Sequence, residues 1–177
     1  MTDRNVIRQP GVSALSTRAI VTELFHHHYR RLVSLAGLMV DDRETAEEVV
    51  QDAFEALYRH WPRLRDPEAA VMYLNRSVVN GSRSWVRRRM TERAYVVPDA
   101  GTVTSAETVG VDRGQRAELV EAVRQLPRRQ REVVVLRYFL DLSEAQIADW
   151  LGVSKGAVKR HAFRANATLQ KRMEAWV

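Results

Sequence analysis

The chain has 177 residues, of which 45% are hydrophobic and 28% are charged, a balance typical of a globular protein with a buried core. It contains no cysteine, which excludes disulfides, cysteine-bound zinc and thiol catalysis. No apolar run approaches the roughly 18 residues that a membrane-spanning helix needs, and no export signal opens the chain, so we expect a cytoplasmic protein without a membrane segment. The net charge of +6 favours a polyanionic partner.

The first half of the chain predicts a tail followed by helices. Residues 1–18 lack periodicity and are expected to form a flexible tail. Residues 19–90 then carry apolar side chains at the i, i+3, i+4, i+7 spacing of helices, which predicts a first domain. Either Asp42 or Thr45 can cap its second helix, and Trp61-Pro62 should end that helix. The inner faces of the first two helices are Tyr29, Leu32, Val33, Ala36, Met39 and Val40, and then Ala46, Val49, Val50, Ala53, Phe54 and Leu57.

A long helix and a second helical domain complete the prediction. Asp66 followed by Pro67 is a good N-terminal cap for the long helix. Residues 91–115 lose the periodicity, gain Gly, Pro, Ser and Thr, and read as a linker. Residues 116–177 form the second domain, with a helix broken at Pro127 and another reaching Leu140. Strand patterns are absent, so the predicted fold is all-α, with two small helical domains joined by a flexible linker. The inward side of the long helix is predicted to hold Val71, Leu74, Val78 and Trp85.

The most specific pattern lies near the carboxyl end and predicts a helix-turn-helix. Ser143 and Gln146 form a capping box, Gly152 suits a tight turn, and Ser154 can cap the next helix at once. Such a pair of helices offers its second helix to the major groove of DNA. The alternative is an ordinary helical hairpin with a solvated basic face. Residues 154–172 hold six Lys or Arg and no acid, which favours DNA binding. The predicted outer face carries Lys155, Lys159, Arg160, Phe163 and Arg164.

A second basic face lies on the long helix of the first domain. Arg76, Asn80, Arg83 and Arg87 are spaced i, i+4, i+7 and i+11 and therefore share one helix face. Arginines suit phosphates, and an asparagine can read a base edge. Trp61 lies near the loop that leads into this helix, and an aromatic side chain beside arginines could stack on unpaired bases. The alternative is that Trp85 is a core residue and that the arginines only solubilise the helix.

The preceding helix has the opposite charge. Residues 41–55 hold seven acids against one arginine, and Glu48, Gln51, Asp52 and Glu55 make one stripe. Such a stripe would be repelled by DNA and suits a basic protein surface. The chain offers no nucleophile, metal cluster or phosphate loop to accompany these carboxylates, so we expect no enzyme. The consecutive histidines at 26–28 splay by about 100° each on a helix, which disfavours a metal site, and we expect no cofactor.

These residues resemble a known family. The stretch "YRRLVSLAGLMVDDRETAEEVVQDAFEALYRHWPRLRDPEAAVMYLNRSVVNGSRSWVRRR" is similar to domain 2 of extracytoplasmic-function (ECF) RNA polymerase sigma factors, and "LPRRQREVVVLRYFLDLSEAQIADWLGVSKGAVKRHAFRANATLQ" is similar to their domain 4. The resemblance runs from about residue 21 to 173, in the family's order and without an intervening domain. The "RDPEAAVMYLNRSVVN" segment and the preference for Arg over Lys resemble actinobacterial members.

The resemblance implies a transcription initiation factor that binds core RNA polymerase and directs it to promoters. Its domain 2 helix would grip the β′ clamp helices of the polymerase through Glu47, Glu48, Gln51, Asp52 and Glu55. The −10 element would be recognised and melted by Trp61, Arg65, Arg76, Asn80, Arg83 and Arg87, with Asn80 where the family often has its wedge residue. The −35 element would be read by Ser154, Lys155, Lys159, Arg160, Phe163 and Arg164, and domain 4 would contact the β flap. An anti-sigma protein is a further partner that the resemblance admits.

Two departures from the family pattern affect the promoter sequence. Ala157 stands where the family usually has Thr, and Asn166 where an Arg is common.

Two rival functions account for fewer features of the sequence. A stand-alone helix-turn-helix regulator leaves the acidic stripe and the Arg-Asn face unexplained. A protein-interaction module with incidental basic charge would bind DNA without sequence preference and with steep salt dependence.

Overall fold

The computed structural model describes residues 10–64, 66–95 and 115–174, and these residues are almost entirely helical, without a strand. The predicted all-α class is therefore confirmed. The elements are α1 (Pro10–Gly37), α2 (Arg43–Leu64), α3 (Pro67–Tyr95), α4 (Gln115–Arg124), α5 (Arg128–Val134), the π-helical turn η1 (Val135–Phe139), α6 (Glu144–Leu151) and α7 (Lys155–Glu174).

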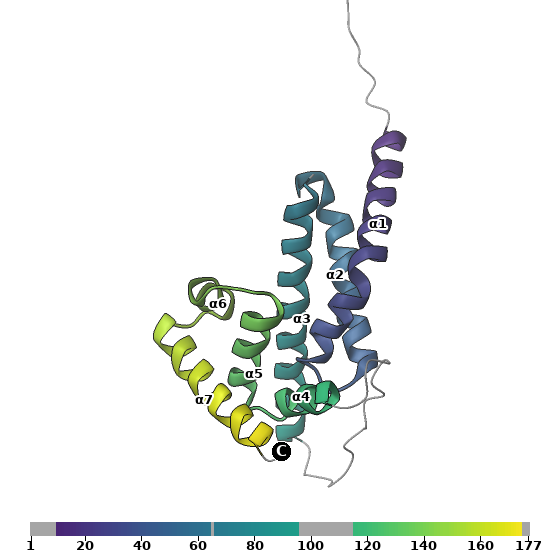
Figure 1. Ribbon diagram of the computed structural model, residues 1–177. Helices are drawn as coiled ribbons and strands as arrows, with labels where there is room; N and C mark the ends of the chain where they lie inside the picture. The colour runs from purple at the N-terminus through teal and green to yellow at the C-terminus, as the bar shows by residue number, and fades with distance from the viewer. Residues whose placement is uncertain (1–9, 65, 96–114, 175–177) are drawn as a thin grey trace, which may run out of the picture.

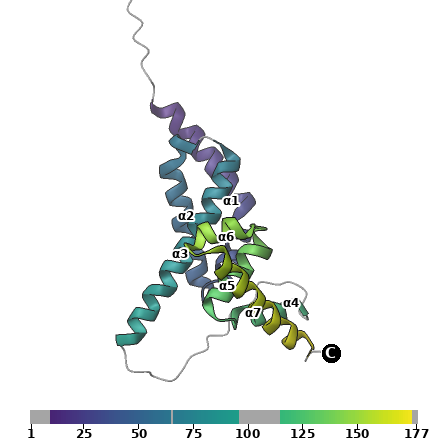
Figure 2. The ribbon, with the colours of Figure 1, turned by 90° about the vertical axis from the view of Figure 1, so that its left-hand side faces the viewer.

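The N-terminal module consists of α1, α2 and α3. The three helices run side by side, each antiparallel to the next, as Figures 1 and 2 show. The turn from α1 to α2 is fixed by Asp42, whose carboxylate accepts bonds from the Thr45 N–H at 2.8 Å and the Thr45 hydroxyl at 2.9 Å. Asp66 caps α3 by accepting the Glu68 N–H at 3.0 Å, as predicted. The largest fully buried side chains are Leu32, Leu35, Val40, Val50, Leu57, Leu74, Val78 and Val79.

Three helix ends differ from the prediction. Helix α1 begins at Pro10, so residues 10–18 are helical rather than a tail, whereas residues 1–9 lie outside the described ranges. Proline is well tolerated in the first helical turn, because its missing N–H has no partner there. Helix α2 continues past Pro62 to Leu64, and α3 reaches Tyr95 within the predicted linker. Residues 91–95 lack an apolar stripe, which predicts a linker, but a helix can continue through residues without such a stripe. The rest of that linker, residues 96–114, lies outside the described part.

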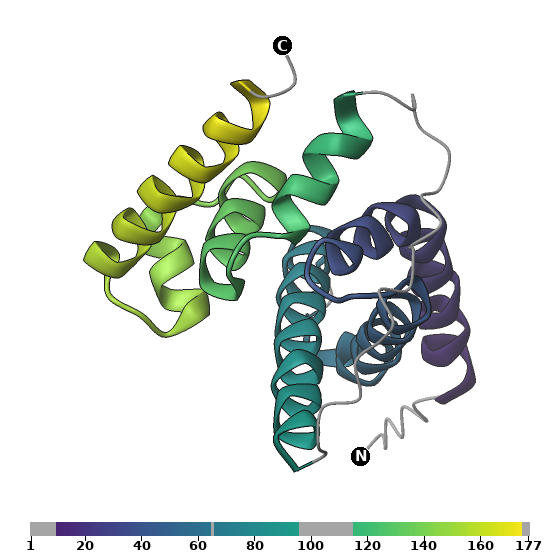
Figure 3. The same ribbon diagram turned by 90° about the horizontal axis from the view of Figure 1, so that it is seen from below.

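The C-terminal module, α4 to α7, lies against one side of α3 (Figures 1 and 3). Its core is formed by Val133, Leu136, Ile147, Leu151, Val158 and Ala165. The predicted capping box is present, with the Ser143 hydroxyl 3.3 Å from the Gln146 N–H and the Gln146 side chain 2.9 Å from the Ser143 N–H. Ser154 caps α7 through the Ala157 N–H at 3.2 Å. The helix-turn-helix geometry expected from these residues is therefore formed.

One local feature of this module was not predicted. The sequence predicts an ordinary helix through Leu140, but the structure has a π-helical turn over Val135–Phe139. A π turn holds more residues per turn than an α-helix and is rare. Here it keeps Val135 and Leu136 buried while Tyr138 remains 63% exposed.

Gly152, between α6 and α7, allows a test of how much the left-handed turn conformation contributes to stability. Its φ of 65° is left-handed, and a Cβ there would meet no heavy atom within 4 Å. Gly152→Ala should therefore lower the free energy of unfolding by about 1–2 kcal/mol through backbone strain alone. Urea unfolding of the full chain measures this change. The matched control is Gly156→Ala in the first turn of α7, which should not lower stability, because its Cβ would make only ordinary contacts. Equal losses in both variants would contradict this account.

Candidate nucleic-acid interface

The outer face of α7 is basic and accessible. Val158 and Ala165 are fully buried on the inner side, whereas Phe163 is 75% exposed on the outer side. One cation is partly compensated, because the Lys159 ammonium lies 3.8 Å from the Glu144 carboxylate of α6. The structure exposes every residue predicted for this face: Ser154, Lys155, Lys159, Arg160, Phe163 and Arg164.

The predicted face of α3 is exposed in part. Arg76, Asn80 and Arg87 are exposed, but only 21% of the Arg83 side chain is exposed, because it points into the C-terminal module. Burial lowers the pKa of the Arg83 guanidinium, and the neighbouring Glu132 carboxylate partly opposes that shift. Leu74, on the inner side of the helix, is fully buried.

The prediction that Trp61 contacts DNA is wrong in this structure. Trp61 is only 6% exposed and belongs to the hydrophobic core. It lies one helical turn after the fully buried Leu57, so the two side chains share the inner face of α2. Trp85 is partly buried, and the Arg89 guanidinium lies 4.9 Å from its ring centroid. Arg65 lies outside the described residues.

The predicted acidic stripe forms the outer face of α2. Glu48, Gln51, Asp52 and Glu55 are exposed, and Glu47 is half-buried. The inner face of the same helix holds the buried residues Val49, Val50, Ala53 and Leu57. Two of the carboxylates have basic neighbours on α2 itself, since Glu47 lies 2.7 Å from Arg43 and Glu55 lies 3.8 Å from Arg59. The stripe therefore presents carboxylates that an external basic surface can approach.

The histidines of α1 differ in exposure. His26 and His27 are exposed and His28 is half-buried. The pKa of His28 is lowered, first by burial and then by the nearby charges of Arg31 and His27, so we expect its imidazole to be neutral at pH 7. Within the described residues no cluster of three or more His, Cys, Asp or Glu side chains could hold a metal ion.

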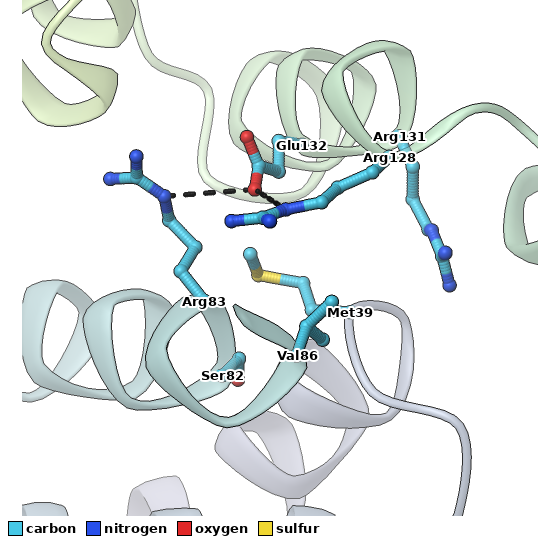
Figure 4. Close-up of a pocket in the computed structure, with 7 residues that line it drawn as sticks. All are labelled: Met39, Ser82, Arg83, Val86, Arg128, Arg131 and Glu132. Carbon is cyan, nitrogen blue, oxygen red and sulfur yellow. Dashed lines mark hydrogen bonds and ion pairs between the residues drawn. The ribbon is translucent and has the colours of Figure 1, made fainter. Parts of the chain in front are cut away.

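Sequence reasoning missed the contacts between the two modules. Arg83 of α3 approaches the Glu132 carboxylate of α5 across a small cleft, and Arg128, one turn earlier on α5, binds the same carboxylate, as Figure 4 shows. Glu132 is only 3% exposed, although nothing in its sequence surroundings marks it as a core residue. Arg131 lines the same cleft, and its pKa is lowered chiefly by burial. A glutamate between arginines in "RRQREVV" reads as a solvated helix face, and only its contact with α3 reveals a structural role.

Comparison with known proteins matches both modules to one family. Residues 24–92 match Sigma-70 region 2, and residues 116–169 match Sigma-70 region 4. The RNA polymerase sigma-E factor of Streptomyces antibioticus is 34% identical over 138 residues, which are 77% of this chain and 74% of the relative. The ECF RNA polymerase sigma factor SigM of Mycobacterium tuberculosis strain H37Rv is 32% identical over 153 residues, covering 84% of this chain and 74% of SigM.

Solved structures share the fold. CnrH in complex with the cytosolic domain of CnrY has a TM-score of 0.60 at 23% identity, covering 93% of this chain and 94% of CnrH. The sigma factor RpoE of Bartonella quintana, in complex with the anti-sigma factor NepR, has a TM-score of 0.64 at 20% identity, covering 86% of this chain and 96% of RpoE.

Two helical modules with these matches define an RNA polymerase sigma factor, which directs the polymerase to promoters for transcription initiation. Within that class, the chain belongs to the extracytoplasmic-function sigma factors, and its relatives include actinobacterial members. None of the helices in the described ranges is both long and apolar enough to cross a membrane.

Proposed function

We propose that three charged faces of this sigma factor each bind a different partner or DNA element. The N-terminal module acts as sigma domain 2 and the C-terminal module as sigma domain 4. The exposed acids of α2 dock on the β′ clamp helices of core polymerase. The Arg76–Arg87 face of α3 holds and opens the −10 element. The outer face of α7 reads the −35 element, and its module also contacts the β flap.

The observation that carries the proposal is the sorting of charge by helix. The outer face of α2 gathers exposed carboxylates, whereas α7 presents exposed cations and no acid from Ser154 to Arg172. An acidic face is repelled by phosphates, and a basic face attracts them. One chain with both faces suits the simultaneous binding of a basic protein surface and DNA.

Three further proposals follow from family membership. The chain itself catalyses no reaction, because the polymerase supplies the chemistry. It works in the cytoplasm, where polymerase and chromosome meet. An anti-sigma protein is a candidate partner, as NepR is for the RpoE protein of similar fold.

The −35 assignment is tested by run-off transcription with core polymerase on genomic fragments, followed by start-site mapping and alanine variants. Arg160→Ala and Arg164→Ala should weaken promoter binding. A base-reading residue should cost about 1–3 kcal/mol and relax preference at one position, whereas a phosphate contact should lower the salt slope by about one. Lys159→Ala should have a smaller effect, because Glu144 already compensates its charge.

The control is Lys171→Ala, an exposed cation near the far end of α7. It should leave preference for the −35 sequence unchanged. Losses that are negligible in all variants, or equal to that of Lys171→Ala, would remove the DNA-reading role of α7.

A further inference from the structure

Tyr138 is a large aromatic residue that the structure leaves on the surface of the C-terminal module. It belongs to η1 and is 63% exposed, although Val135 and Leu136 of the same turn are buried. In an α-helix, Tyr138 would lie three and four positions after the buried Val135 and Val134 and would share their inner face. The π turn, whose hydrogen bonds reach one residue further along the chain, breaks this spacing. It thereby turns Tyr138 outward.

The Tyr138 hydroxyl is held against α7. The side-chain amide of Asn166 donates a hydrogen bond to the Tyr138 oxygen at 3.3 Å. Asn166 is exposed and follows Lys159 by seven positions and Phe163 by three, so these residues share one stripe of the helix. Phe163 is the 75% exposed residue of the outer face. The Tyr138 hydroxyl therefore lies at the edge of the face proposed above to read the −35 element.

The direction of this hydrogen bond leaves the Tyr138 proton available. An amide nitrogen can only donate, so the phenol oxygen is the acceptor and its own O–H is free to bond elsewhere. Among the residues that the structure describes, none accepts a hydrogen bond from that hydroxyl. The exposed phenol thus offers a neutral donor to an acceptor outside the chain.

A DNA phosphate is the acceptor that fits this position. Lys155 and Lys159 lie on the same stripe as Asn166, and the sequence from Ser154 to Arg172 contains no acid, so this face attracts phosphates. Tyrosine hydroxyls are regular donors to phosphate oxygens in protein–DNA interfaces. Such contacts fix the position of a protein on the duplex without reading its sequence.

We propose that Tyr138 and Asn166 form a phosphate-binding pair at the edge of the −35 interface. Tyr138 donates to a phosphate oxygen, and Asn166 is a positioning residue that holds the phenol. The inference rests on the proposed function of α7 and adds a contact from η1, which precedes the helix-turn-helix. Because the pair is uncharged, its contact releases no counterion from the DNA, unlike a contact made by lysine or arginine.

The test measures binding of the full chain to a −35 duplex that ends before the −10 element, by anisotropy of labelled DNA. Tyr138→Phe removes only the hydroxyl and should weaken binding roughly tenfold, the loss expected for a hydrogen bond to a charged acceptor. The same loss should appear on a duplex of scrambled sequence, and the salt dependence should match that of wild type. The matched control is Tyr58→Phe, at a 45% exposed tyrosine of α2, which should bind as wild type does.

A double-mutant cycle tests the role of Asn166. Asn166→Ala should weaken binding by only about threefold, because the phenol is kept but is no longer held. If Asn166 acts through Tyr138, the double variant should bind within about twofold of Tyr138→Phe alone. Fully additive losses would overturn the positioning role.

A scan of the duplex with single methylphosphonates, each replacing one charged phosphate oxygen by a methyl group, locates the partner. Wild type should lose affinity at a phosphate whose replacement costs Tyr138→Phe nothing. Each protein is compared with itself on modified and unmodified DNA. The scan therefore stays decisive if Tyr138→Phe lowers the stability of the module.

Unchanged binding in Tyr138→Phe, a loss confined to the −35 sequence, or a scan identical to that of wild type would overturn the phosphate contact. If Arg160→Ala and Arg164→Ala weaken binding in the same assay, the assignment of α7 to the −35 element stands and only the pair is rejected. If those two variants also bind as wild type does, that assignment fails as well. The two failures are thereby distinguished.

Discussion

Reversing Glu48 and Asp52 to lysine should abolish binding to core RNA polymerase and leave the helical content of the chain unchanged. Both side chains are exposed on α2, on the side opposite its buried residues, so the core does not depend on them. If they face a basic surface of the polymerase, each reversal turns attraction into repulsion. Like charges across an interface cost several kcal/mol, which is a loss of affinity of about two orders of magnitude or more.

A pull-down with core polymerase and a fluorescence titration measure this loss. The matched control is Glu23→Lys with Glu92→Lys, which changes the net charge equally from exposed positions on α1 and α3. The control should bind nearly as wild type does. Polymerase binding that survives reversal of the acidic stripe, or fails equally in the control, would show that the stripe is not the docking surface.

The second large effect is expected at Asn80, which lies between the arginines on the exposed face of α3. Opening a base pair costs a few kcal/mol of unstacking, which contacts to the exposed base and its phosphates must offset. Asn80→Ala should therefore spare polymerase binding and −35 contact but block strand opening. Asn80 is a better choice than Arg76 or Arg83, because those two arginines also contact Asp149 and Glu132 of the C-terminal module.

Permanganate reactivity of thymines near the start site should disappear on duplex promoters with Asn80→Ala. Transcription should recover on a template whose −10 region is already mismatched, because the cost of melting has been removed. Glu92→Ala is the control on the same helix, about 120° around its axis. Equal failure on duplex and mismatched templates would assign Asn80 to another role, such as holding the fold.

Local signals in the sequence predicted the fold class and the turns. Asp42, Asp66, Ser143 and Ser154 each cap a helix as expected, because a cap depends only on residues two or three positions away. The turn at Gly152 is likewise predictable, because it depends on the left-handed conformation of that single residue. The exposed faces of α2 and α7 follow from helical periodicity, which places apolar residues on the opposite side.

Contacts between distant residues could not be predicted in this way. Trp61 looked like a stacking residue beside a loop, but the α1–α3 core buries it. No local pattern marks Glu132 as buried, because its partner Arg83 belongs to α3. The π turn depends on how Val135 and Leu136 pack in the C-terminal core, which no local pattern encodes. In each case the deciding partner lies far away along the chain.

The arginines that connect the two modules differ from their acceptors in how they tolerate mutation. Arg31, Arg83 and Arg124 all donate hydrogen bonds to backbone carbonyl oxygens of the opposing module. Every residue type carries that oxygen, so no substitution on the accepting side deletes an acceptor. The accepting helices can therefore change their side chains over evolutionary time, as long as their backbone stays in place. Each arginine donor, by contrast, is lost when its own side chain is replaced, so at these three contacts selection acts on the donor rather than on the acceptor.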